Sequence, residues 1–140
     1  MKYLQGFDEL SESVSSRTKQ RDKIAGNYFK LQDVTRKSGV VIGEYEGVKV
    51  RVVNRDLISD EHPEWKKYIG SHHWGKRTGY IPEDEIWIVQ DKKFTLSRIK
   101  KLLNHEIIER QMMRALIEDR KMSTLGAWKK AHGYVKKMGF

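Results

Sequence analysis

The sequence contains no cysteine, only 2 prolines and no long apolar run among its 140 residues. The absence of cysteine excludes disulfide scaffolds, thiolate catalysis, iron–sulfur clusters and cysteine-ligated zinc fingers. No apolar stretch approaches the roughly 20 residues that a membrane-spanning helix needs, so no membrane partner is expected. The segment from Met1 to Asp8 has no apolar core like that of a signal peptide. These absences together predict a cytoplasmic protein.

Positive charge is in excess, because 28 Lys and Arg against 19 Asp and Glu give a net charge of +9 at pH 7. A surplus of this size favours contact with polyanions, so a nucleic-acid partner is one expectation. The candidate phosphate contacts lie near the two ends of the sequence: Arg17, Lys19, Arg21 and Lys23, and Lys129, Lys130, Lys136 and Lys137. A solvated, lysine-rich surface explains the same composition, which also suits a thermophilic protein.

The hydrophobic pattern divides the chain into a polar N-terminal part and a longer patterned part. Sparse apolar residues between Asp8 and Lys37 predict one or two weakly amphipathic helices, so residues 1–38 are interpreted as a polar helical arm. From Gly39 onward, strand-like segments alternate with turn signals and are followed by two long helical segments. We therefore predict an α+β domain over residues 39–140, in which helices pack on one face of a small antiparallel sheet.

Three strands and two helices are predicted in this domain. The strands are Val40–Tyr45, Val48–Val52 and Glu85–Val89, and Glu46-Gly47 is the turn between the first two. The helices run from Leu96 to about Arg120, capped by Thr95 or Ser97, and from a Ser123-Thr124 cap to about Lys137. The stretch from Asn54 to Gly79 is predicted to be irregular.

The first of these helices carries ionisable residues on its apolar side. At about 100° per residue, His105, Glu106 and Glu109 fall on the same side as Leu102 and Met113. Buried carboxylates are costly unless they are paired or bind a metal, so this placement indicates a site. A helix with a satisfied interior histidine and salt-bridged glutamates would give the same pattern.

The second helix also places a histidine on its buried face. Trp128 and His132 belong to an i, i+3, i+7, i+10 pattern that begins at Leu125. If the two helices pack antiparallel through these faces, His132 approaches His105 and Glu109. Two imidazoles and one carboxylate are the ligand set of one class of catalytic zinc site, with the fourth position open to water. Manganese or iron would accept the same set.

The spacing of these residues also assigns a role to Glu106. Residues at i and i+4, here His105 and Glu109, lie one turn apart on the same face and can share a metal. Glu106 then lies beside the metal, where it can take the proton of a water molecule that the metal activates. These are the mechanics of the helical H-E-x-x-H motif of metalloproteases, with Glu109 in place of the second histidine.

The segment Leu103–Glu109, followed by Met112-Met113 and Ala131-His132, resembles the small zincin-like metallopeptidases. More narrowly, it resembles the minimal metallopeptidase-like proteins of archaea, phages and archaeal viruses, which share an H-E-x-x-E helix and a downstream Ala-His pair. The resemblance covers about Gly79 to Val135. It implies a minimal zincin-like fold, a zinc cofactor, a peptide or protein substrate and, if the source is a virus, the host cytoplasm.

The resemblance also implies roles for individual residues. His105, Glu109 and His132 would be the zinc ligands, and Glu106 would be the catalytic base. In zincins, the strand before the motif helix is the sheet edge on which an extended substrate lies. This implies a substrate-binding role for the strand around three residues: Ile86, Trp87 and Ile88.

Other candidates and other functions stay open at this point. Tyr80 or Tyr134 could polarise a scissile carbonyl, although an ordinary half-buried tyrosine explains each of them. The cluster His72-His73-Trp74 could supply a ligand or a hydrogen-bond donor, or could simply be solvated. The alternatives to a zinc-dependent peptidase are a basic nucleic-acid-binding protein of a virus or mobile element, and a zincin-like binding module without activity.

Overall fold

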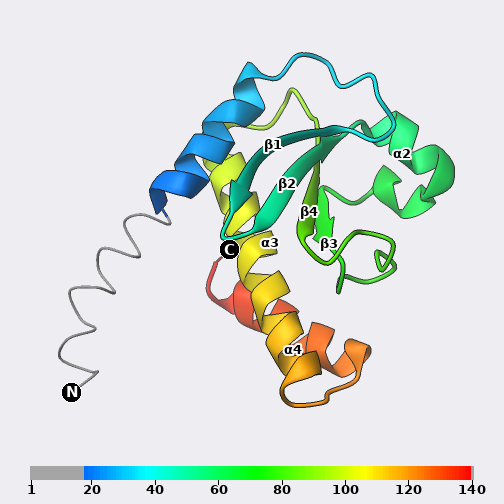
Figure 1. The fold of residues 1–140 in the computed structure, drawn as a ribbon, viewed down its shortest axis with the longest axis vertical. Helices are drawn as coiled ribbons and strands as arrows, with labels where there is room; N and C mark the ends of the chain where they lie inside the picture. The colour runs from blue at the N-terminus through cyan, green and yellow to red at the C-terminus, as the bar shows by residue number, and fades with distance from the viewer. Residues whose placement is uncertain (1–17, 140) are drawn as a thin grey trace.

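The computed structural model describes residues 18–139, which form an α+β fold built on a four-stranded sheet (Figure 1). In chain order its elements are a helix over residues 18–30, β1 (Val40–Tyr45), β2 (Val48–Val53), α2 (Arg55–Glu61), the 3-10 helix η1 (Pro63–Lys66), β3 (Gly70–His72), β4 (Glu85–Val89), α3 (Leu96–Glu118) and α4 (Thr124–Lys137). The predicted fold class is confirmed, as are β1, β2, β4, α3 and α4. The predicted helix caps Thr95 and Ser123 each accept a hydrogen bond from the first turn. None of the described helices could cross a membrane.

The sheet has the strand order β1-β2-β4-β3 and is mixed, which corrects the prediction of a wholly antiparallel sheet. β1 and β2 form the predicted hairpin, and its turn residues Glu46 and Gly47 both have positive φ, as a tight two-residue turn requires. β4 pairs with β2 in parallel, because residues 54–84 form a crossover long enough to return the chain in the same direction. β3 lies within that crossover, pairs antiparallel with β4 and forms one edge of the sheet.

The crossover contains three short elements in the stretch that was predicted to be irregular. α2, η1 and β3 are seven, four and three residues long, too short for a hydrophobic period to be visible. α2 begins after Asn54, whose side chain accepts a hydrogen bond from the backbone N–H of Leu57. Trp65 of η1 is fully buried and packs in a cluster with Val53 and Val89 at the ends of two strands. The crossover therefore covers one end of the sheet.

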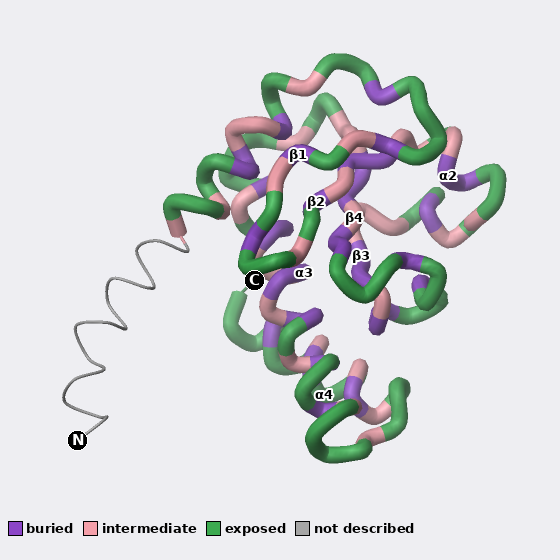
Figure 2. Tube along the Cα trace, in the orientation of Figure 1, coloured by how far each residue is buried: buried purple, intermediate pink, exposed green. Residues whose placement is uncertain are grey.

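The main core lies between the sheet, α3 and the helix over residues 18–30. All three contribute buried members, among them Val50, Val52, Ile86, Ile88, Ile99, Leu103, Ile107, Ile24, Ala25 and Tyr28. Figure 2 shows the buried residues of the strands and of α3 gathered where these elements meet. The described part of the predicted arm therefore contributes side chains to the same core as the strands. The rest of that arm, residues 1–17, lies outside the described residues.

The two halves of α3 have different partners. The first half packs on the sheet, whereas Met113 and Leu116 in the second half pack against Ala127 and Ala131 of α4. Figure 1 shows α4 beside the part of α3 that extends past the strands. Residues 105–109 occupy the junction, so their side chains meet both the sheet edge and α4.

Candidate metal centre

A single carboxylate, that of Glu109 on α3, is contacted by three histidines from three elements. Its Oε1 accepts a hydrogen bond from His72 Nε2 of β3 at 3.0 Å. Its Oε2 accepts one from His132 Nδ1 of α4 at 2.9 Å and lies 3.1 Å from His105 Nε2, one turn earlier on α3. Burial alone would raise the pKa of Glu109, but the hydrogen bonds from the three imidazoles outweigh burial and hold that pKa well below its usual range. Glu109 is therefore ionised.

The three residues predicted as metal ligands lie together. One ring nitrogen each of His105 and His132 and one carboxylate oxygen of Glu109 lie within 4.8 Å of one another. The ring of His132 stacks on Trp128 at 4.6 Å and meets the His105 ring edge-on at 5.5 Å, which orients both imidazoles. Two imidazoles and one carboxylate are a donor set that suits zinc, and also manganese or iron.

Glu106 lies next to these residues, and one of its carboxyl oxygens has no hydrogen-bond partner in the part of the chain that the structure describes. The residue is only 4% exposed, and this oxygen, Oε2, is buried. Burial, and then the charge of Glu109, raise the pKa of Glu106 to about 8. Gly70 of β3 makes room for this side chain, because a Cβ at that position would lie 3.3 Å from Glu106 Cγ. An unpaired buried carboxyl group is costly, so its presence here indicates a binding site for a cation or a water molecule.

These residues open onto one cleft of about 610 Å³ that is bordered by β3, the first half of α3 and α4. A cleft of this size is large enough for a small ligand or part of a peptide. His105, Glu106, Glu109 and His132 line it, whereas His72 is fully buried behind Glu109. A second group of potential ligands, formed by His72 with the two glutamates, is buried throughout. The set that a metal ion can reach from solvent is therefore His105, Glu109 and His132.

Comparison of the chain with family models, curated proteins and solved structures finds no match. The resemblance to zincin-like metallopeptidases therefore rests on the motif residues alone. What the protein does is inferred from the site itself.

The predicted substrate strand is wrong, because β4 is not an edge of the sheet. β4 has β2 on one side and β3 on the other, so Ile86, Trp87 and Ile88 have no free backbone edge for a substrate. Both isoleucines are fully buried in the core. The edge next to the cleft is β3, whose Gly70 and Ser71 line it. Which strand ends at an edge depends on pairing between distant segments, and the order of the strands in the sequence does not reveal it.

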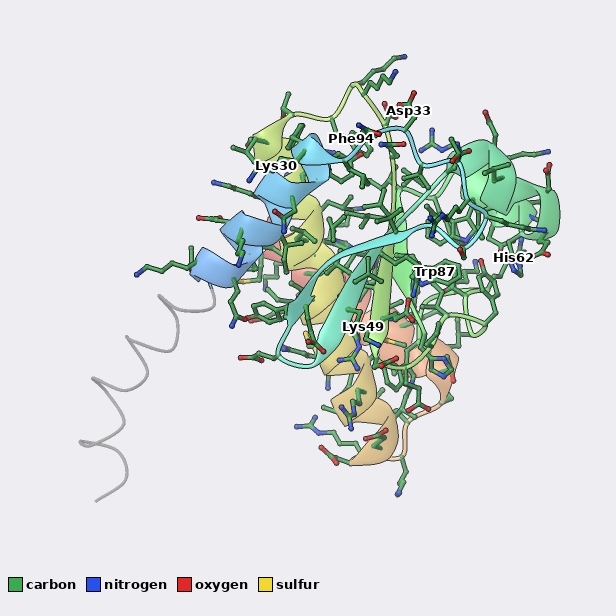
Figure 3. The ribbon with its side chains drawn as sticks, turned by 45° about the horizontal axis from the view of Figure 1, so that its top comes forward. Lys30, Asp33, Lys49, His62, Trp87 and Phe94 are labelled. Atoms are coloured by element: carbon green, nitrogen blue, oxygen red, sulfur yellow. The ribbon has the colours of Figure 1, made fainter. Side chains whose placement is uncertain are left out.

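Tyr80 also lies away from the cleft. Its hydroxyl accepts a hydrogen bond from Trp65 Nε1 and donates one to Glu64, and its ring stacks on His62 at 3.6 Å. Figure 3 labels His62 beside α2. Tyr80 is therefore part of the aromatic packing under the crossover and not a group that faces a substrate in the cleft.

Of the N-terminal basic residues predicted to contact nucleic acid, the three that the structure describes do not line this cleft. Arg17 lies outside the described residues. Lys19 and Lys23 are exposed on the helix over residues 18–30, one turn apart. Arg21 instead turns toward α3, where it donates a hydrogen bond to the side chain of Asn104. In the described part of the chain, these residues therefore do not share one face.

His72 is the residue of the site whose role the sequence did not indicate. It was a candidate only as a member of the cluster His72-His73-Trp74, and the structure separates the members of that cluster. His72 contacts Glu109, whereas His73 Nδ1 pairs with the carbonyl of Ile81. Burial, which the contact with Glu109 only partly offsets, lowers the pKa of His72. A neutral His72 therefore donates its Nε2 proton to the glutamate.

Proposed function

We propose that this protein is a zinc-dependent hydrolase that cleaves peptide bonds. His105, Glu109 and His132 would hold the ion, and Glu106 would be the general base. The observation that carries the proposal is the convergence of three potential ligands beside a buried, unpaired carboxyl group in one open cleft. A zinc ion in this position would activate a water molecule and, by its charge, lower the pKa of Glu106 from about 8 toward neutrality.

The chain's own residues supply the rest of the chemistry. Glu106 offers an unpaired oxygen that can take a proton from water in the cleft and pass it to a leaving amine. His72 occupies Oε1 of Glu109 and so leaves Oε2 to face His105 and His132. A peptide substrate is favoured because the edge strand β3 borders the cleft, where an extended chain can add backbone hydrogen bonds.

The proposal predicts that the purified protein binds about one zinc ion per chain. Elemental mass spectrometry of the native protein, and of protein dialysed against chelator and reloaded, measures this directly. His105→Ala and His132→Ala are expected to lose the ion. His62→Ala is the matched control, because His62 stacks on Tyr80 and does not line the cleft, so this variant should keep the ion. Hydrolysis of a quenched-fluorescence peptide library should disappear with chelator and return with zinc. A wild-type protein that binds no zinc after reloading would contradict the proposal.

His72 is expected to act as the residue that positions Glu109. His72→Ala should weaken zinc binding by about 10- to 100-fold, as removal of hydrogen-bond partners behind metal ligands typically does. His72→Gln, which keeps an N–H donor near the position of Nε2, should restore part of that affinity. Competition with a zinc chelator measures the affinity. Equal affinities in the wild type and both variants would show that the contact between His72 and Glu109 has no influence on the metal site.

A further inference from the structure

Four basic side chains line the same cleft as the candidate metal centre: Lys67, Lys76, Arg98 and Lys101. All four are exposed, and none of them forms an ion pair with a residue that the structure describes. The acidic residues in the lining are Glu106 and Glu109, which are buried and belong to the centre itself. The positive charge of these four side chains is therefore not neutralised by an ion pair with a described residue.

Several cations elsewhere on the described surface do have carboxylate partners. Lys100, the immediate neighbour of Lys101, pairs with Asp22 at 3.5 Å. Arg114, further along the same helix, lies 3.2 Å from Glu118. The cations at the cleft lack such partners among the described residues, so their charge is available for a ligand.

The positions of the cations on α3 relate them to the candidate centre. Arg98, Lys101 and His105 follow i, i+3 and i+7 spacing on α3 and all three line the cleft. At a rise of about 1.5 Å per residue, Lys101 lies about 6 Å and Arg98 about 10 Å along the helix axis from His105. An extended peptide advances about 3.3 Å per residue. For a peptide that runs along α3 with its scissile bond at the candidate metal centre, Lys101 therefore lies level with the side chain two residues from that bond. Arg98 lies level with the side chain three residues from it.

We propose that the cleft selects peptides with acidic side chains two and three residues from the cleaved bond. Successive side chains of an extended chain point to opposite faces, so Arg98 and Lys101 on α3 bind one of them. Lys67 and Lys76, on the segments that flank β3, bind the other. This inference rests on the proposed peptidase function and names its substrate class. A peptide is favoured over a nucleic acid because the edge strand β3 forms part of the cleft wall.

The test measures binding without cleavage. Zinc-loaded Glu106→Gln protein is titrated, by fluorescence anisotropy, into labelled peptides of equal length. They carry glutamate, glutamine or lysine at the second and third positions on both sides of a central Ala-Phe. A single-stranded oligonucleotide is the fourth probe. The glutamate peptide is expected to bind at least about tenfold more tightly than the glutamine peptide, by an amount that shrinks as salt rises.

Reversing the charge of two of the cations tests whether they cause the preference for the glutamate peptide. The double variant Arg98→Glu, Lys101→Glu should lose most of the preference for the glutamate peptide. Its fold should persist, because both side chains are exposed and acidic residues are favourable near a helix N-terminus. The matched control is Lys130→Glu, Lys137→Glu, which changes the net charge equally on exposed positions of α4 outside the cleft. This control should keep the preference.

The inference is overturned by equal affinities for the glutamate and glutamine peptides, or by an equal loss of preference in the two double variants. It is also overturned if the oligonucleotide binds and the three peptides are not distinguished. The peptidase proposal is judged separately, by zinc-dependent cleavage of the same peptides by the wild-type protein. If cleavage is absent and selective binding of the glutamate peptide persists, the peptidase proposal fails and the recognition of acidic peptides stands.

Discussion

Glu106→Gln is expected to slow hydrolysis steeply while one zinc ion stays bound. The substitution keeps the shape of Glu106 but removes the group that takes the proton from water, so kcat should fall by about 10²- to 10⁴-fold, as is typical when a general base is lost. The side chain is buried with a raised pKa, hence uncharged in the metal-free protein near neutral pH. A neutral amide therefore replaces a neutral acid, and the fold should be undisturbed. Steady-state hydrolysis of a peptide found in the library screen, beside elemental analysis of the same preparation, measures both effects.

Glu109→Gln is the matched comparison on the same helix. Glu109 accepts hydrogen bonds from His72 and His132, and its Oε2 is one of the three potential ligand atoms. The amide should therefore lose both zinc and activity, in contrast to Glu106→Gln, which should lose activity alone. Undiminished hydrolysis by Glu106→Gln would show that another group accepts the proton.

In the metal-free protein, Glu106 should lower the free energy of unfolding progressively as the pH rises from about 5 to about 8. The pKa of this side chain is raised from 4.5 to about 8 by burial and by the charge of Glu109. Between these values the unfolded chain has released a proton that the folded protein still holds, so the free energy of unfolding falls with pH until the folded group ionises. A pKa difference of this size corresponds to roughly 3–5 kcal/mol.

Urea unfolding of chelator-treated wild type and Glu106→Gln across this pH range isolates the effect. The wild type should lose stability relative to the variant at each higher pH. Glu109 has the opposite shift, so its contribution is complete above about pH 4.5 and is lost only in acid. The lowered pKa of His72 makes stability rise with pH in the lower part of the range, but it does so in both proteins and cancels in the comparison. Parallel curves for the two proteins would mean that Glu106 is not held in an apolar environment.

The sequence predicted the elements whose own pattern is long enough to be recognised. Apolar and polar residues alternate over Val48–Val52 of β2, and α3 and α4 carry capping residues before extended helical periods. The crossover was missed because its helices and strand are each no more than seven residues long. The parallel pairing of β2 with β4, and with it the inner position of β4, depends on that crossover. Both errors about the sheet therefore have the same origin.

The residues of the candidate site also fall into those that the sequence could predict and those that it could not. His105, Glu106 and Glu109 are neighbours on one helix, so helical geometry alone places them together. His132 required the further assumption that two consecutive helices pack against each other. α3 and α4 do so, but the buried face of α4 is formed by Ala127, Ala131 and Val135, and Leu125 of the predicted face is exposed. His72 comes from a three-residue strand and reaches Glu109 across 37 positions of the chain. No local pattern encodes such a contact, and the same holds for the four cations that surround the cleft.

Because His132 lies on the last helix, the three potential ligands come together only in molecules in which α4 is docked on α3. α4 packs on α3 in a cluster of its own, in which Ala127, Ala131 and Trp128 meet Met113 and Leu116, apart from the main core of the sheet. A peripheral helix of this kind can detach while the rest of the fold stays intact. In the detached state the centre retains only two of its three ligands, so the apparent affinity for the ion is the intrinsic affinity scaled by the fraction of molecules with α4 docked. An ion that binds only the docked form in turn holds the helix in place.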